Sequence, residues 1–525
     1  MRTLLVGLGG LCLVILAALG PALAEDSVPL RAGRISLVQG GAGYRPVGGD
    51  WFDTAVNLPV ASGTALRTGD KGSAEFRLGD TVVALAGGSQ IEIAHLEPHL
   101  VQIRLEHGRV GIVIRALGDR DSIEIDLPRG AVQLLEPGHY DIRGGDSAPA
   151  RVVVFDGRAR FTGGGDDSTI ASGSAARFEA SETIATRFEP AKPDSFDTAL
   201  QARVSEEEST AGRIHLSPEL AGLAELDQSG DWRAVDGYGV AWFPESMPDG
   251  WAPYRDGSWR WISPWGWTWI DHASWGFAPA HYGRWARIDD RWAWVPGKPV
   301  ADPAYAPAVV AFLGTPGVGL SYADAFTPAI AWFPLGPGEV YWPGFTRDTD
   351  LIRRLNAADV DDLSVIRLAD NGGLPPAISN ADYQNRRFTS AVPRSVFIAG
   401  QQIAAALLSI PKARLDTVPL IAETTQFPPA PAPRPVAVAS AAANKAAPLV
   451  AAARAALPAL VAAAHARVHG LARLAHLAHG NPAPSHAAVV QRGAHALGRL
   501  RVMASLSGGH GEAHRHLAVL RGRAR

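Results

Sequence analysis

Short runs of alternating apolar and polar residues fill the chain from about Arg34 to Phe188. The runs read SAEFRL, TVVALA, LVQIRLEHGRVGIVIRA, SIEIDLP, AVQLLE and ARVVVFDGRARFTG, with Gly and Asp residues between them. A period of two residues interrupted by turn residues is typical of β-strands. Within the longest run, His107-Gly108 separates two alternating halves, which predicts a hairpin there. The segment is therefore predicted to form an all-β domain, either a sandwich or a compact roll.

A second pattern is a repeat rich in tryptophan. WRAVDGYGVAWF, which begins at Trp232, matches WRWISPWGWTWI, which begins at Trp259. WARIDDRWAWV, which begins at Trp285, is a third and slightly shorter copy. Each copy has two alternating arms around a turn that reads DG, SPWG or DD. This arrangement predicts a β-hairpin in each copy.

The tryptophans of the repeat have two interpretations. Hairpins this short have little else to bury, and each ring removes about 150–250 Å² from water, so the rings suffice as a core. Alternatively, some rings stack on sugars, while nearby acids and histidines bind the hydroxyl groups; this reading predicts glycan or peptidoglycan binding. The candidate glycan-binding rings are Trp259, Trp261, Trp267, Trp269, Trp285, Trp292 and Trp294, and the candidate polar partners are Asp256, Asp271, His272, His281, Asp289 and Asp290.

Between and after these regions the pattern weakens. DSFDTALQARVSEEEST predicts a short helix in a connector, and RDTDLIRRLNAADVDDLSVI predicts another helix within the second domain. FPPAPAPRPVAVAS, which begins at Phe427, is a Pro/Ala linker. We therefore divide the chain into a signal peptide (1–24), a β domain (25–188), a connector (189–231), a Trp-rich hairpin-repeat domain (232–400) and a disordered Ala/Pro/His-rich tail (401–525).

The N-terminus predicts export. A charged start is followed by an apolar stretch from Leu4 to Leu19 and then by Ala22-Leu23-Ala24, which predicts cleavage after Ala24 and a periplasmic or secreted protein. An uncleaved membrane anchor is the alternative, but the apolar stretch is shorter than the roughly 20 residues that a spanning helix needs. Cys12, the single cysteine, lies in this segment. The mature chain is therefore expected to contain no disulfide and no thiolate metal site.

The net charge of −3 hides an asymmetry. The tail after residue 430 contains twelve Lys and Arg against one acid, Glu512, so it carries +11 and the remainder carries −14. Such a tail can touch an anionic surface or fold back on its own acidic domain. It also holds nine of the sixteen histidines. The pairs His465/His469 and His476/His479 have helical spacing, but an Ala-rich composition produces this spacing by chance, so we assign no metal site.

Motifs for other chemistry are not found. The sequence shows no phosphate-binding loop, zinc signature or nucleophile elbow, and therefore predicts no cofactor. Asp289-Asp290 are adjacent in a turn, where their side chains diverge, so they do not form a glycosidase pair. Acids and bases are balanced in the Trp-rich region, which argues against nucleic-acid binding. We expect that the protein is not an enzyme.

Four segments of the first domain resemble a known family. LRTGDKGSAEFRL, LEHGRVGI, IEIDLPRGAVQLLEPGHYDIR and RVVVFDGRARF are similar to signature segments of the FecR-type periplasmic domain. In iron-citrate signalling this domain lies outside the inner membrane and modulates a sigma factor. The resemblance implies a β fold and an exported location for about residues 34–180. The signalling proteins carry an N-terminal cytoplasmic segment and a membrane span, which a signal peptide replaces here, so sigma-factor control is not implied.

The Trp-rich region has a resemblance of its own. SPELAG, LDQSGDW, WFP, PWGWTW, GRW, WVPG, YAPAVVAF, WFPLGPGEVY and VPRSVF, within about 215–400, resemble an uncharacterised domain often fused after exported FecR-type domains in proteobacteria. That resemblance implies an architecture and no activity. The sequence thus predicts a non-catalytic envelope protein that acts as an interaction or sensor-accessory scaffold with an envelope protein partner. Glycan or peptidoglycan binding is the alternative.

Overall fold

The computed structural model describes residues 28–145, 149–179, 185–206, 222–314, 320–322, 327–367, 374, 378 and 382–421. The predicted signal peptide and the tail beyond Ile421, with its histidine pairs, lie outside these residues. None of the described helices has the length and apolar composition that crossing a membrane requires.

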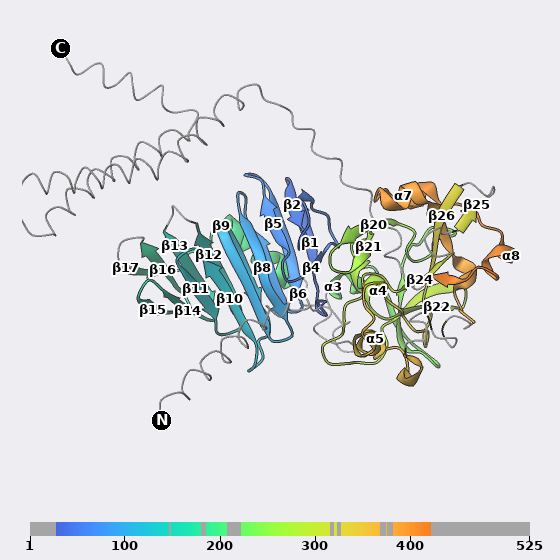
Figure 1. Ribbon diagram of the computed structural model, residues 1–525. Helices are drawn as coiled ribbons and strands as arrows, with labels where there is room; N and C mark the ends of the chain where they lie inside the picture. The colour runs from blue at the N-terminus through green and yellow to red at the C-terminus, as the bar shows by residue number, and fades with distance from the viewer. Residues whose placement is uncertain are drawn as a thin grey trace, which may run out of the picture. The chain divides into compact units, whose positions relative to one another are not determined.

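The first domain consists of seventeen strands that form two sheets joined through one long strand, β9 (Figure 1). The strands are β1 (Gly33–Gln39), β2 (Ala42–Arg45), β3 (Phe52–Asp53), β4 (Pro59–Val60), β5 (Ala65–Thr68), β6 (Ser73–Leu78), β7 (Thr81–Leu85), β8 (Gln90–Glu97), β9 (Leu100–Ile114), β10 (Ser122–Leu127), β11 (Gly130–Leu134), β12 (Gly138–Gly144), β13 (Ala150–Asp156), β14 (Arg158–Gly163), β15 (Asp166–Ala171), β16 (Ser174–Glu179) and β17 (Ala185–Pro190). The first sheet has the order β4-β1-β6-β7-β9-β12-β13-β16-β17. The second has the order β3-β2-β5-β8-β9-β10-β11-β14-β15. The predicted mainly-β fold is confirmed.

The hairpin predicted at His107-Gly108 is wrong. β9 continues through Gly108: residues before it pair with β8 and β10, and residues from it onward pair with β7 and β12. Gly108 has φ +99°, and a Cβ there would lie 2.5 Å from the Ser89 Cα, so only glycine fits. The glycine therefore marks the point where one strand passes from the second sheet to the first, instead of a reversal of the chain.

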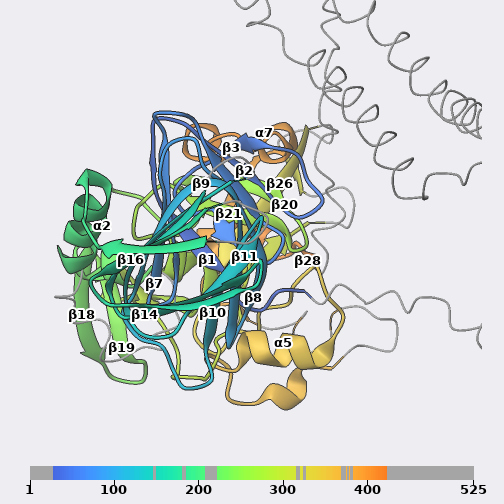
Figure 2. The same cartoon turned by 90° about the vertical axis from the view of Figure 1, so that its left-hand side faces the viewer.

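The core of the first domain lies between the two sheets and is mainly aliphatic. In β10 every second residue is buried, as the alternation SIEIDL predicts. β8 follows the same rule with Ile91 and Ile93 facing the core. Figure 2 faces the β15–β17 end of this sandwich, with helix α2 (Ser195–Glu206) beside it.

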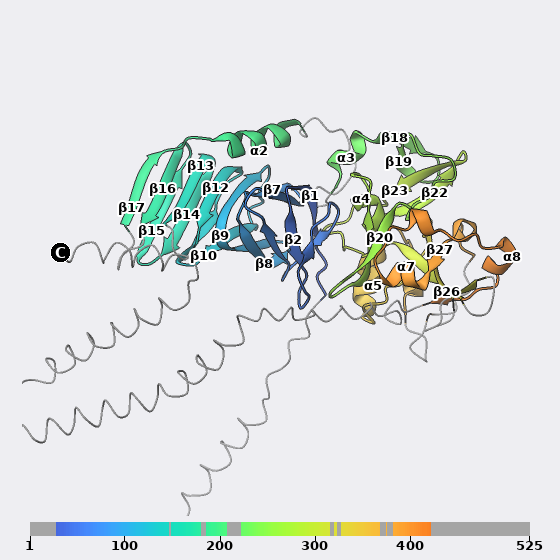
Figure 3. The ribbon, with the colours of Figure 1, turned by 90° about the horizontal axis from the view of Figure 1, so that it is seen from above.

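Helix α2 confirms the helix predicted in the connector, and it packs on the outer face of the first sheet (Figure 3). Leu200 and Val204 of the helix pack with Val82, Ala84 and Val113 of β7 and β9. Because the patch that these three residues form is apolar, the helix buries surface that would otherwise be exposed to water. The connector is thus partly a component of the first domain.

The Trp-rich domain consists of short strands and helices. They are α3 (Ala224–Asp227), β18 (Gly230–Val235), β19 (Gly239–Pro244), β20 (Gly257–Ile262), β21 (Gly266–Asp271), α4 (Phe277–His281), β22 (Arg284–Ile288), β23 (Arg291–Val295), β24 (Val310–Leu313), β25 (Leu320–Tyr322), β26 (Thr327–Pro334), α5 (Thr349–Asn356), η3 (Leu363–Val365), η4 (Arg386–Phe388), β27 (Ser390–Pro393), α7 (Arg394–Ile398), η5 (Ala404–Ala406), α8 (Lys412–Leu415) and β28 (Leu420–Ile421). Helix α5 confirms the helix predicted in this region.

The three predicted hairpins are confirmed as β18–β19, β20–β21 and β22–β23. They do not pair in chain order. The first and third join through Trp242 opposite Trp294 and form one four-stranded sheet, while the second stays a two-stranded ribbon. The turn of the third hairpin places Asp289 and Asp290 at φ +48° and +59°, the backbone of a primed turn.

The ordered domain continues beyond the predicted boundary at residue 400. β28 pairs with β24, and Ile403, Leu415 and Ile421 are buried. These apolar residues are isolated in a sequence without strong periodicity. Only their long-range packing reveals that they belong to the core.

Candidate functional site

Six of the seven tryptophans proposed from the sequence lie in the core of the Trp-rich domain. Trp259, Trp267, Trp269, Trp285, Trp292 and Trp294 are between 0% and 5% exposed, and Trp261 is half-buried. The ring of Trp259 meets Phe312, Trp332 and Phe397 at centroid distances of 5.2, 5.5 and 5.3 Å. The rings therefore supply the core of short hairpins. Glycan binding by their faces stays a prediction, with Trp261 the most accessible of the seven.

The buried indoles also donate hydrogen bonds to irregular backbone. Trp242 donates to Leu226 O at 2.9 Å, Trp285 to Pro279 O at 2.9 Å and Trp294 to Tyr282 O at 2.8 Å. Leu226 O also accepts from Ser229 N at 3.0 Å, whereas the indoles are the donors that reach Pro279 O and Tyr282 O outside a sheet ladder. A phenylalanine at Trp285 or Trp294 would remove those donors. This need explains why the core uses tryptophan.

The polar residues proposed as sugar partners are largely engaged within the fold. The Asp271 carboxylate accepts from Trp269 Nε1 and Ala273 N, and burial raises its pKa to about 6. Burial lowers the pKa of His281 to about 3, and its Nδ1 lies 2.7 Å from Ala306 O. Asp256 and His272 form an exposed pair at 3.2 Å. Asp289 and Asp290 occupy the hairpin turn.

A polar joint connects the sandwich to the Trp-rich domain. Arg34 of β1, 1% exposed, forms an ion pair with Glu225 of α3 at 2.6 Å and also donates to Ser274 O. Asn57 donates from Nδ2 to Asp271 O and Ala273 O at 2.9 and 2.8 Å. These hydrogen bonds and the ion pair form only when both domains are folded and held in this relative position, because a buried charge without its partner is strongly destabilising.

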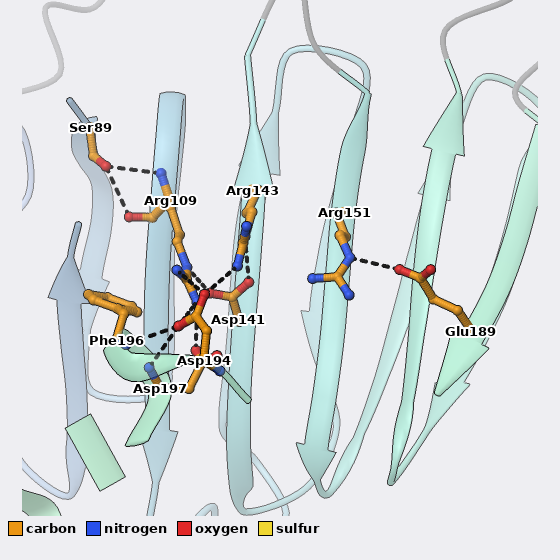
Figure 4. Close-up of polar contacts among 9 residues, drawn as sticks. All are labelled: Ser89, Arg109, Asp141, Arg143, Arg151, Glu189, Asp194, Phe196 and Asp197. Carbon is orange, nitrogen blue, oxygen red and sulfur yellow. Dashed lines mark hydrogen bonds and ion pairs between the residues drawn. The ribbon is translucent and has the colours of Figure 1, made fainter. Parts of the chain in front are cut away.

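A cluster of charges fixes α2 to the first sheet (Figure 4). Arg109 of β9 bonds to the fully buried Asp141 of β12, to Asp194 through both terminal nitrogens at 2.8 and 3.0 Å, and to Asp197 at 2.9 Å. Its guanidinium also lies 4.4 Å from the Phe196 ring centroid. One cation thus links two strands to the start of the helix.

The electrostatics of this cluster follow from its geometry. The hydrogen bonds from Arg109 hold the pKa of Asp194 well below its ordinary range. Burial raises the pKa of Asp197, which faces two other carboxylates. Burial acts to lower the pKa of Arg109, but its bonds with Asp194 and Asp141 outweigh that effect and raise it. The cluster is arranged to hold α2 in place.

Strand β17 lies at the end of the first sheet and pairs with a described strand on one side alone. Among the described strands β17 pairs only with β16, and it carries Phe188, which is 55% exposed. Arg151 of β13 donates to Glu189 of the same edge at 3.0 Å (Figure 4). An edge of this kind offers unpaired backbone groups and an apolar side chain to another chain.

The family comparisons agree with this division of the fold. The family model for the FecR protein matches residues 64–160, and that for the family of unknown function DUF6600 matches residues 223–339. The chain carries a FecR domain followed by a DUF6600 domain. The FecR match spans β5 to β14, so β17 and the Arg34 side of the joint lie outside it. The DUF6600 match contains all three hairpins.

Comparison with solved structures yields weak similarities. Two crystal structures of a candidate anti-sigma factor from Parabacteroides distasonis, at 2.50 and 1.65 Å resolution, are each 11% identical with a TM-score of 0.24. Each alignment covers 26% of this chain and 64% of the other. A search of curated proteins finds no match.

Sequence reasoning did not identify the joint or the Arg109 cluster. Arg34, Arg109 and Asp141 each stand in alternating strand segments where a charged residue usually faces solvent. One signal was present in the connector: Asp194 and Asp197 precede and begin a predicted helix, where carboxylates cap the N-terminus. Within the described residues, no group of three or more His, Cys, Asp or Glu side chains is arranged to hold a metal ion.

Proposed function

We propose that this protein is a non-catalytic interaction protein of the cell envelope, with a regulatory or sensor-accessory role, and that its FecR domain docks a protein partner at strand β17. The observation that carries the proposal is the open side of β17 with the exposed ring of Phe188. The FecR domain and the predicted export signal support an envelope location. The DUF6600 domain is joined to the FecR domain through the Arg34–Glu225 ion pair and would hold the FecR domain in position.

The chemistry of the edge suits a partner that adds a strand. Backbone hydrogen bonds supply affinity in such complexes, and side-chain contacts supply selectivity. Phe188 supplies an apolar contact, and Arg187 and Glu189 place opposite charges on either side of it. Pro190 ends the strand. The exposed ring and the two flanking charges are the features of this edge that a partner strand would contact.

The test is site-specific photo-cross-linking in cells that produce the protein. A photoreactive residue replaces Phe188 in one variant and Val47 in a control, because Val47 is similarly exposed, at 41%, but lies in a loop. We expect a discrete heterologous adduct from position 188 that position 47 does not give. Identical adducts from both positions, or adducts from neither, would reject docking at β17.

The glycan alternative rests on the half-buried ring of Trp261. It predicts that the protein sediments with peptidoglycan sacculi and that Trp261→Ala abolishes sedimentation. Sedimentation that Trp261→Ala leaves unchanged rejects this ring as the platform. Because Trp261 is not part of the sandwich edge, the two experiments give independent results.

A further inference from the structure

Three arginines of the DUF6600 domain gather around one aromatic residue, Phe388. The guanidinium carbons of Arg287 and Arg387 lie 5.5 and 4.8 Å from the centroid of its ring. Arg255 donates from Nη2 to the carbonyl oxygen of the same residue at 3.3 Å. The Trp292 ring packs against Phe388 with the centroids 5.0 Å apart. Strand β22, the short helix η4 and the segment before β20 thus bring three positive charges to one place on the domain.

Arg255 is a half-buried cation that lacks a counter-ion among the described residues. Its guanidinium donates to Ser390 Oγ and to the carbonyls of Gly250 and Phe388, which are all uncharged acceptors. Burial lowers the pKa of Arg255, and no carboxylate of the described residues acts against that shift. Arg109 of the FecR domain, by contrast, is paired with three carboxylates. The charge of Arg255 is therefore left uncompensated.

The other two arginines are also short of negative charge. Arg387 is exposed and forms no hydrogen bond or ion pair with the described residues. Arg287 reaches the carboxylate of Asp290 at 3.6 Å, and that side chain is fully exposed. An ion pair this long and this exposed contributes little. Around Phe388, positive charges thus outnumber negative ones in the part of the chain that the structure describes.

The chemistry of this surface favours an acidic peptide as its ligand. A guanidinium that is stacked on a ring keeps its edge N–H groups free to bind a carboxylate through two parallel hydrogen bonds. The half-buried ring of Phe388 adds an apolar contact, and arginine beside aromatic residues is typical of protein interfaces. An anionic membrane would also meet the exposed carboxylates of Asp289 and Asp290 at the adjoining turn and would be repelled by them.

We propose that the DUF6600 domain docks an acidic segment of a protein partner on an arginine patch, which consists of Phe388, Arg255, Arg287 and Arg387. Carboxylates of the segment bind Arg387 and displace the weakly held Asp290 from Arg287. The charge of Arg255 stabilises them from within the domain. This second docking surface goes beyond the β17 edge of the FecR domain, and the two surfaces are tested separately.

The test measures each arginine separately in the full chain. Phenylglyoxal modifies accessible guanidinium groups, and mass spectrometry of the digested protein gives the modification rate at each position. The probe is decaglutamate at low ionic strength, where exposed charges are least screened. Because each position is measured individually, binding of the probe to the basic tail does not obscure the result. We expect decaglutamate to slow modification of Arg387 by about threefold or more, since the N–H donors are then engaged with carboxylates.

Arg233 is the matched reference. It is an exposed arginine of the same domain and lies 4.9 Å from the Phe243 ring centroid, but it is already paired with Asp231 at 3.2 Å. Its modification rate should stay unchanged when decaglutamate is added. Equal slowing at Arg233 and Arg387 overturns the proposal, and so does an unchanged rate at Arg387.

A lipid arm distinguishes a membrane from a peptide. Vesicles of phosphatidylglycerol and phosphatidylcholine replace decaglutamate in the same measurement. We expect the vesicles to leave Arg387 reactive. Slowing by the vesicles without slowing by decaglutamate overturns the proposal in favour of a lipid surface.

Two substitutions test whether the patch acts as one site. Arg287→Gln should remove most of the slowing at Arg387, whereas Arg233→Gln should leave it intact. Asp290→Asn frees Arg287 at an exposed turn where asparagine tolerates the left-handed backbone. It should lower the decaglutamate concentration for half-maximal slowing by about two- to fivefold, the scale of an exposed ion pair. Slowing at Arg387 that neither Arg287→Gln nor Asp290→Asn alters overturns the shared site.

Discussion

The FecR domain buries aliphatic side chains such as Ile91, Ile103 and Val132 between two broad sheets, whereas the DUF6600 domain buries tryptophans under strands of five or six residues. In the sandwich most backbone groups pair in ladders, so the core needs only apolar volume. In the hairpin domain much of the backbone is irregular, and its buried carbonyls need donors. Tryptophan supplies volume and a donor together. The choice between an aliphatic and a tryptophan-rich core thus follows from the fraction of backbone groups that are hydrogen-bonded within sheets.

The largest expected effect tests the double role of tryptophan. Trp294→Ala should lower the free energy of unfolding by about 3–5 kcal/mol, since it removes a fully buried ring. Trp294→Phe should lower it by about 1–2 kcal/mol, because Tyr282 O loses its donor. Ile103→Val in the FecR core should lower it by about 1 kcal/mol through lost volume alone. Urea titration followed by near-ultraviolet circular dichroism measures all three, and a Trp294→Phe variant as stable as wild type would refute the donor role.

The FecR domain depends on charge at one place, the attachment of α2. Arg109→Met should lower the free energy of unfolding by about 2–3 kcal/mol, because the buried Asp141 would keep only Arg143 as a cationic partner and would lie beside two other carboxylates. Hydrogen exchange in α2 should accelerate. Arg143→Met is the control: Arg143 also bonds to Asp141 at 2.9 Å, but its side chain is 38% exposed and Arg109 remains beside Asp141, so the expected loss is below about 1 kcal/mol. Equal losses from the two variants would mean that Arg109 has no special role.

Asp271 makes the DUF6600 domain sensitive to pH. Because burial raises its pKa to about 6, above the value of about 4 for an unfolded chain, the native state binds this proton more tightly. The contribution of Asp271 to stability is therefore greatest below about pH 4 and is lost as the pH rises to about 6. For a partly buried carboxyl we expect a change of about 1–2 kcal/mol across this window. Asp271→Asn should remove this slope in urea titrations, whereas exposed Asp256→Asn should keep it.

The smallest effect concerns the turn of the third hairpin. Asp290 has φ +59° and a fully exposed side chain, so Asp290→Gly should raise stability by roughly 0.5 kcal/mol by relieving the left-handed backbone. The ion pair of Asp290 with Arg287, at 3.6 Å, is exposed and contributes little. Thermal denaturation should show a small rise in Tm. A lower Tm would indicate that the ion pair outweighs the relief of backbone strain.

Local pattern alone determined much of this protein. The alternating segments and the three Trp-containing hairpins follow from a period of two residues and from turn residues, and the helices at 195–206 and 349–356 lie in the segments that were predicted to hold one helix each. These features depend on neighbours within a few positions. The mainly-β class and the FecR and DUF6600 resemblances could therefore be recognised without coordinates.

Tertiary structure decided the rest, because the same local pattern permits several long-range pairings. An alternating run with a central glycine can reverse or continue, and at Gly108 the packing against Ser89 selects continuation. Alternation places Trp259 and Trp269 on strand faces, but only the neighbouring Phe312, Trp332 and Phe397 show that their rings are enclosed. Likewise, a charged residue in a strand predicts a solvated face. Arg34 is buried and Arg109 is partly buried because partners more than eighty residues away, Glu225 and Asp194, neutralise them.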